Sequence, residues 1–238
     1  MAIYVTSDAH GHVRALDEAL SKISLASDDT LYVLGDMIDR GPDPVGVIKL
    51  VRSLPNARVL KGNHEQIMLD AIIGQDPLDA ETWDINGGWT TREQLNDMEF
   101  EAYEELVRWM AGLPLYAVAE TDERPYLLVH AGIEMEAARA FLLEHGVDCS
   151  DGAGAVDADR ELLKQMLAVQ SSDDLLWIRH GYWDAPTGLL SAEGRGPVVV
   201  SGHTPTVSLG RYCEVGGLAG LDEESGRGQI VCLGGEDT

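Results

Sequence analysis

The architecture of this chain follows from one stretch, Leu31-Tyr32-Val33-Leu34-Gly35-Asp36-Met37-Ile38-Asp39-Arg40-Gly41. Four apolar residues run into a glycine, which predicts a buried strand that ends in a tight turn. Two carboxylates and a guanidinium follow at the end of that strand, where open α/β sheets place their ligands. One carboxylate can bridge two cations, the other can orient a neighbour, and Arg40 can bind a phosphoryl oxygen. An ordinary solvated turn also fits Asp-Arg-Gly-Pro, so the flanking sequence has to separate the two interpretations.

The same arrangement recurs on both sides of this stretch. Short apolar runs at residues 3–6 and 57–60 predict two further strands, and helical stripes of apolar residues separate the three strands. Strand, helix and strand in this order predict βαβ units, and therefore an α/β fold with ligands at the strand ends. Each strand leads into side chains of the metal-ligating or acid–base kind: Asp8 and His10 after the first, Asp36 and Asp39 after the second, and Asn63 and His64 after the third.

Residues 74–112 interrupt this alternation. The segment is acidic, and its apolar residues have helical spacing over residues 99–110. It holds three of the five tryptophans, Trp83, Trp89 and Trp109, which we expect to act as packing anchors rather than as substrate contacts. The segment predicts a helical insertion beside the site, within a single domain that covers residues 1–238.

Two more strand ends lie in the second half of the chain. A hairpin over residues 114–129 ends in His130, and an apolar run at residues 198–200 leads into His203. Apolar spacing also predicts two helices and two closing regions of strand. These elements are expected near residues 134–146, 157–168, 212–221 and 229–233.

The composition of the chain excludes several classes of protein. Because 41 acidic residues stand against 17 basic ones and the net charge is −24, a nucleic-acid backbone would be repelled. There is no run of roughly 18 apolar residues, and we expect no signal peptide because the N-terminal residues enter a predicted strand at once. We therefore predict no membrane partner and a cytoplasmic location. Three cysteines lack metal-ligand spacing and predict free thiols, with Cys213 and Cys232 as small buried hydrophobic residues.

Six side chains that can bind metal come from the predicted strand ends. Their mixture of carboxylate, imidazole and amide oxygen suits manganese, iron or zinc. Six ligands exceed one tetrahedral zinc site, so two metals are implied, with Asp36 as the natural bridge. A metal pair about 3.5–4 Å apart can hold the atoms of an in-line displacement at phosphorus and supply hydroxide at neutral pH. The six candidate ligands are Asp8, His10, Asp36, Asn63, His130 and His203.

Five motifs that contain these residues resemble those of the metallophosphoesterase superfamily, in particular the phosphoprotein phosphatase (PPP) family of serine/threonine phosphatases in its bacterial form. The motifs occur in family order, and Trp83 with Asn86-Gly87-Gly88 also resembles the bacterial members. The resemblance implies a calcineurin-like layered α/β sandwich, with two mixed β-sheets flanked by helices. The motifs are Asp8-x-His10-Gly11, Gly35-Asp36-x-x-Asp39-Arg40-Gly41, Gly62-Asn63-His64-Glu65, His130-Ala131-Gly132 and Gly202-His203-Thr204.

The resemblance also implies a role for each site residue. His64 resembles the general acid, oriented by Asp39, while Arg40 and Arg179 resemble the arginines that bind phosphate. The cofactors implied are two divalent metal ions, with manganese preferred and iron or zinc as alternatives. One metal would be held by Asp8, His10 and Asp36, and the other by Asp36, Asn63, His130 and His203.

Two positions depart from the family pattern. The family usually has glycine where Ser7 stands, and Ser7 is not a ligand. After the last histidine the family often has Ile-Asp-Thr-Gly, whereas this chain has Cys213-Glu214-Val215-Gly216, which leaves the C-terminal closing loop without a family counterpart.

The predicted activity is metal-dependent hydrolysis of phosphomonoesters, by direct attack of a metal-bridging hydroxide on phosphorus. The preferred substrate is a protein phosphorylated on serine or threonine, and a small phosphoester is an alternative substrate. An alternative is a symmetrical bis(5'-nucleosyl)-tetraphosphatase, a sister group that often lacks the aspartate equivalent to Asp39. A non-catalytic binding module on the same fold is a third reading, although such proteins should have lost ligands. The sequence makes no prediction about the oligomeric state.

Overall fold

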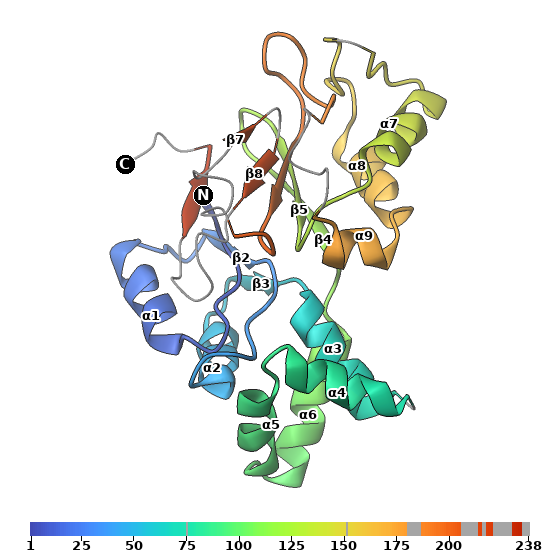
Figure 1. The fold of residues 1–238 in the computed structure, drawn as a ribbon. Coiled ribbons are helices and arrows are strands. Elements are labelled where there is room, and N and C mark those ends of the chain that lie inside the picture. The colour runs from blue at the N-terminus through green and yellow to red at the C-terminus, as the bar shows by residue number, and fades with distance from the viewer. Residues whose placement is uncertain are drawn as a thin grey trace.

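A computed structural model describes the chain over residues 1–74, 76–150, 152–179, 187–205, 214–215, 218–220 and 230–234. Two β-sheets form its centre, with helices α1–α6 on the side of the first sheet and α7–α9 on the side of the second (Figure 1). Buried apolar side chains fill three layers: between the first sheet and its helices, between the two sheets, and between the second sheet and its helices. The predicted sandwich of two mixed sheets flanked by helices is confirmed.

The first sheet has the strand order β3-β2-β1-β9. The first three strands are parallel and are joined by crossover helices, and the last is antiparallel to β1. Helix α2 begins at Pro44, because the Asp43 side chain accepts a hydrogen bond from the backbone N–H of Gly46 and a proline occupies the first turn. The elements are β1 (Ile3–Thr6), α1 (Val13–Lys22), β2 (Thr30–Val33), α2 (Pro44–Ser53), β3 (Ala57–Val59) and β9 (Val231–Leu233).

The second sheet has the strand order β4-β5-β6-β8-β7. The predicted hairpin forms its antiparallel edge, β5, β6 and β8 run parallel, and β7 closes the other edge antiparallel to β8. Three helices, α7 to α9, pack on its outer face. The elements are β4 (Tyr116–Glu120), β5 (Pro125–Val129), α7 (Met135–Glu144), α8 (Arg160–Ala168), α9 (Ser172–Trp177), β6 (Val198–Ser201), β7 (Glu214–Val215) and β8 (Leu218–Gly220).

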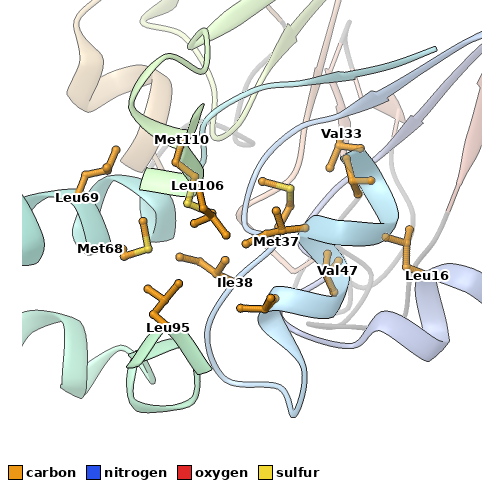
Figure 2. Packing of buried hydrophobic residues seen from close by; sticks show 14 of the residues in the cluster. Leu16, Val33, Met37, Ile38, Val47, Met68, Leu69, Leu95, Leu106 and Met110 are labelled. Atoms are coloured by element: carbon orange, nitrogen blue, oxygen red, sulfur yellow. The ribbon is translucent and has the colours of Figure 1, made fainter. Parts of the chain in front are cut away.

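The core of the first half anchors the acidic loop after β2. Met37 and Ile38, the residues between the two aspartates, are fully buried and point into the cluster that includes Met68, Leu95 and Met110 (Figure 2). Removing two such side chains from water stabilises the loop by about 1.5–3 kcal/mol each. The flanking carboxylates are therefore held in place by the apolar residues between them.

The segment after the third strand is helical, as predicted. Helix α3 leads into three further helices, which pack together below the first sheet in Figure 1. The expectation for its tryptophans holds only in part: Trp83 is buried and Trp109 is half-buried, but Trp89 is 57% exposed because it begins a helix at the surface. The four helices are α3 (Asn63–Ile73), α4 (Pro77–Ile85), α5 (Trp89–Asn96) and α6 (Phe100–Ala111).

Two further expectations concern membranes and cysteines. Within the described ranges, no helix combines the length and the apolar character needed to cross a bilayer. The prediction that Cys232 is buried was wrong: it lies on β9, the edge strand of the first sheet, and is exposed. Cys213 lies outside the described residues, as do Arg211, Tyr212 and Gly216 around the closing loop.

Candidate active site

The backbone around the predicted ligands has an unusual conformation. In the part of the chain that the structure describes, every non-glycine residue with a positive φ is a predicted site residue. Residues other than glycine rarely adopt a positive φ, and backbone strain of this kind is concentrated at active sites. The residues are Asp8 (φ 56°), His10 (40°), Asp36 (53°), Asp39 (69°), Arg40 (64°) and His203 (63°).

Hydrogen bonds between adjacent loops hold this strained backbone. The loop after β1 donates to the loop after β2, through the N–H groups of Asp8 to Gly35 O at 3.1 Å and of His10 to Asp36 O at 2.9 Å. The loop after β3 lies so close that a Cβ atom on Gly35 would be 2.4 Å from the backbone nitrogen of Gly62. Only glycine permits that approach, which explains the glycines that follow the second and third strands.

The carboxylate of Glu65 ties the second and third loops together. It is fully buried and accepts three backbone N–H bonds, from Asp36 at 2.8 Å, Met37 at 2.9 Å and Gly62 at 2.8 Å. Sequence reasoning assigned Glu65 no role, although it ends the third motif. The role of Glu65 depends on its burial beside Asp36, which the sequence alone does not show.

The six predicted metal ligands come together in two groups around Asp36. On one side, Asp36 Oδ2 lies 3.6 Å from His10 Nε2, which is itself 4.0 Å from Asp8 Oδ1. On the other side, Asp36 Oδ1 lies 3.5 Å from His130 Nε2. The two oxygens of one carboxylate thus face different groups, which is the arrangement expected of a bridging ligand.

An amide oxygen completes the second group. Asn63 Oδ1 lies 2.8 Å from His130 Nε2 and 2.9 Å from His203 Nδ1. The three side chains are almost fully buried, and they reach this point from α3, from the end of β5 and from the end of β6. These elements are far apart in the chain, so the second group depends on the packing of the two sheets.

The donor atoms suit divalent metal ions. His10 Nδ1 lies 2.9 Å from Ile38 O, and His130 Nδ1 lies 2.8 Å from Leu34 O. A backbone carbonyl that accepts the Nδ1–H group leaves the Nε2 lone pair directed into the site. Burial lowers the pKa of His10 to about 3 and raises that of Asp36 well above its usual range, with the Asp8 charge adding to the second shift. Burying a charged carboxylate among neutral imidazoles costs free energy, and a bound cation would offset that cost. The site therefore strongly favours a cation.

The two predicted arginines point into the site from opposite halves of the molecule. Arg40 Nη1 lies 3.0 Å from His10 Nε2, and Arg40 Nη2 lies 2.8 Å from His64 Nε2. Arg179 Nε lies 2.8 Å from His203 Nε2. Paired guanidinium donors at the exposed rim of the site match the geometry of a phosphoryl group.

His64 and Asp39 form a buried pair beside the candidate metal groups. His64 Nδ1 lies 2.7 Å from Asp39 Oδ2, and both side chains are fully buried. Asp39 also accepts from Thr91 Oγ1 at 2.6 Å and from Trp83 Nε1 at 3.1 and 3.2 Å. Burial raises the pKa of Asp39 to about 6, against the opposing bonds from Thr91 and Trp83.

The helical insertion is therefore part of the site, which sequence reasoning did not predict. The signal was the Trp83 and Asn86-Gly87-Gly88 motif, whose physical basis is now visible. A Cβ atom on Gly88 would lie 2.1 Å from the Trp83 ring, and Gly87, at φ 93°, accepts the backbone N–H of Arg40 at 3.0 Å. Glycine at both positions lets the insertion approach the acidic loop and bring the indole to Asp39.

The fold and this site together are those of the metallophosphoesterase class of proteins. The chain matches the calcineurin-like phosphoesterase family over residues 1–235, and it belongs to that family. Its His/Asp groups can bind the divalent metals that such enzymes use. The family predicted from the five motifs is thus confirmed.

Curated relatives of the chain are similar to part of it. It is 32% identical over 136 residues to the symmetrical bis(5'-nucleosyl)-tetraphosphatase of Erwinia tasmaniensis, and 33% over 138 residues to that of Proteus mirabilis. Each match covers 56% of this chain and 45% of the relative, so the chain spans about half the length of the curated relatives it matches.

Solved structures are similar over nearly the whole chain. A putative diadenosine tetraphosphatase has a TM-score of 0.56 at 17% identity, with 100% of this chain and 95% of that chain covered. A cold-active protein-tyrosine phosphatase of a Shewanella species has a TM-score of 0.53 at 19% identity, with coverages of 98% and 75%. A protein serine/threonine phosphatase of Saccharomyces cerevisiae has a TM-score of 0.52 at 17% identity, with coverages of 98% and 72%. At these identities the similarity demonstrates the fold alone.

Proposed function

We propose that this hydrolase removes phosphate from serine and threonine side chains of proteins. The observation that carries the proposal is the buried His64–Asp39 pair, whose aspartate accepts hydrogen bonds from both Trp83 and Thr91. A serine or threonine alkoxide is a strongly basic leaving group, and it needs a proton as its bond to phosphorus breaks. A nucleoside diphosphate is a much weaker base and gains less from an acid.

The candidate ligands would hold two divalent metals, with manganese first and iron or zinc as alternatives. Bound there, the metals would activate water and withdraw charge from the phosphoryl oxygens. Asp36 would serve both ions, because its carboxylate faces both groups of ligands. One ion would be completed by Asp8 and His10, and the other by Asn63, His130 and His203.

The chain's own groups would bind and protonate the substrate. Arg40 and Arg179 would take the phosphoryl oxygens, so that Arg40 leaves its contact with His64 Nε2. Burial and the Arg40 charge lower the pKa of His64 to about 3 in the protein alone. A phosphoryl dianion opposes the Arg40 contribution directly, so the proton on Nε2 is favoured when substrate binds. Asp39 keeps the ring oriented through Nδ1 while Nε2 faces the leaving oxygen.

A second candidate is the symmetrical hydrolysis of dinucleoside tetraphosphates. It is favoured by the curated relatives, which are symmetrical bis(5'-nucleosyl)-tetraphosphatases, and by one structural neighbour, a putative diadenosine tetraphosphatase. Those matches span about half of each curated relative, and the structural neighbour is 17% identical. The acidic insertion would also repel a second long polyanion beside the site.

A direct comparison of substrates tests the proposal. We expect the manganese-loaded protein to hydrolyse phosphoserine peptides with a higher kcat/KM than diadenosine tetraphosphate at matched metal concentration. A higher kcat/KM for diadenosine tetraphosphate would make the second candidate the function. A single-domain organisation over residues 1–238 and a cytoplasmic location stay predictions.

A further inference from the structure

A second cavity lies away from the active site, between the edges of the two sheets. It has a volume of about 700 Å³ and opens between β3 and β4, the edge strands, with α2, α6 and α8 around it. This size is typical of pockets that take a small organic ligand. Among the residues that the structure describes, those lining it include no candidate metal ligand or catalytic residue.

The cavity exists because the core between the sheets stops short of this edge. Arg58 is the cross-strand partner of Tyr32, which packs between the sheets, so Arg58 faces the second sheet as well. Ala117 lies opposite on β4 and packs against the same core. An arginine that faces an alanine leaves the last row of this core unfilled.

The charge of the lining is opposite to that of the protein. Four basic side chains line the cavity and, within the described part of the chain, no aspartate or glutamate does. The whole chain carries 41 acidic residues against 17 basic ones, so a lining of bases alone is a marked local reversal. The four bases are Arg52, Arg58, Arg160 and Lys164.

Two of these bases are already paired and two are available to a ligand. Arg52 forms an ion pair with Glu105. Arg160 donates to Val118 O at 3.1 Å, and its Nε lies 4.0 Å from Glu120 Oε2. The side chains of Arg58 and Lys164 make no hydrogen bond or ion pair with any residue whose position is described. Such cations beside a concave surface can bind an anion that enters it.

Aromatic rings form the other part of the lining. Trp109 and Tyr116 are half-buried in the wall, and the guanidinium of Arg52 lies 5.4 Å from the centre of the Trp109 ring. A flat ring can stack on such a surface, while its charged group reaches the free cations. From this combination we infer that the cavity between β3 and β4 is a nucleotide-binding site, separate from the hydrolytic centre and able to take an aromatic base with its phosphate chain.

Calorimetry on the metal-loaded full chain tests this inference. The probe is α,β-methylene ADP, titrated in saturating inorganic phosphate so that the hydrolytic site is already occupied. We expect binding that persists in phosphate and that weakens about tenfold or more in Arg58→Glu and in Lys164→Glu, because each change replaces attraction by repulsion. Lys49→Glu is the matched control, since Lys49 is exposed on α2 outside the lining and should leave the Kd within about twofold.

A further variant changes the cavity without changing its charge, and the folding of every variant is measured. Ala117→Leu fills the cavity with apolar atoms and should block the probe, while circular dichroism and the melting temperature report whether each variant is folded. An unchanged Kd in folded Arg58→Glu and Lys164→Glu would overturn the site. Tripolyphosphate that binds as tightly as the probe would overturn the nucleotide class, since it lacks the ring. Because every readout is binding in the presence of phosphate, the result is independent of which phosphoester the active site hydrolyses.

Discussion

The two halves of the molecule contribute to the active site in different ways. The first half supplies Asp8, His10, Asp36 and Asn63 from three adjacent parallel strands, through loops hydrogen-bonded to one another. The second half supplies His130, Arg179 and His203 from elements spread along the chain.

These later residues reach the site because the second sheet packs on the first. The backbone N–H of His203 donates to Asp8 Oδ2 at 3.0 Å, and a Cβ atom on Gly202 would be 2.0 Å from that same oxygen. The site residues of the first half are therefore positioned by neighbouring loops, while those of the second half are positioned by the packing of the core between the sheets. Four changes test this distinction, and the largest effect is expected at the residue shared by both groups.

Replacing Asp36 should have the largest effect. Asp36→Asn removes the charge that serves both ligand groups, so we expect the loss in kcat/KM to exceed the roughly 10²–10⁴-fold contributed by one acid–base group. Elemental analysis should show that the protein retains less of both metals, because the binding of each is weakened. In His203→Ala, by comparison, the metal bound by the first half should remain. Two tightly bound metals in Asp36→Asn would argue against the bridge.

Replacing His64 should have the next largest effect, and its size should depend on the leaving group. We expect His64→Ala to lose roughly 10²–10⁴-fold in kcat/KM on phosphoserine peptides, and distinctly less on nitrophenyl phosphate, whose phenolate needs little protonation. Metal content is measured in parallel. Equal losses on both substrates, with metals bound and chemistry rate-limiting, would refute the acid role.

The core between the sheets can be weakened without touching the site. Leu128 is fully buried there, so Leu128→Ala should lower the free energy of unfolding by about 2–5 kcal/mol, measured by urea denaturation at saturating metal. Leu143→Ala is the control, because that side chain is 65% exposed on α7 and should change stability by less than about 0.5 kcal/mol. Similar values for the two variants would show that this core does not hold the halves together.

The smallest effect is expected where the insertion orients Asp39. Trp83→Phe and Thr91→Val each remove one donor to that carboxylate, and each should lower kcat/KM on phosphoserine peptides by roughly 10–100-fold. The loss on nitrophenyl phosphate should be smaller, which a general structural defect would not produce. Trp89→Phe changes an exposed tryptophan and should be neutral. An equal loss on both substrates would assign Trp83 to packing alone.

The sequence by itself predicted the order of the elements, the two mixed sheets and the family. Apolar periodicity marks each strand and so predicted the order of the elements. The two mixed sheets and the family were implied by the resemblance of the five motifs, whose polar residues follow those strands directly. Nine of the ten predicted site residues lie in the five motifs, Arg179 lies outside them, and the structure brings all ten together. Their assigned roles stay predictions for the experiments above.

Only the tertiary structure revealed which groups support these residues. Elements that are distant in the sequence are joined by the Asp36 and Met37 bonds to Glu65, by the Trp83 and Thr91 bonds to Asp39, and by the cavity beside Arg58. The exposure of Trp89 and Cys232 was mispredicted for a related reason. Side-chain chemistry and spacing can be read along the chain, but burial and long-range partners arise only when the sheets and helices pack.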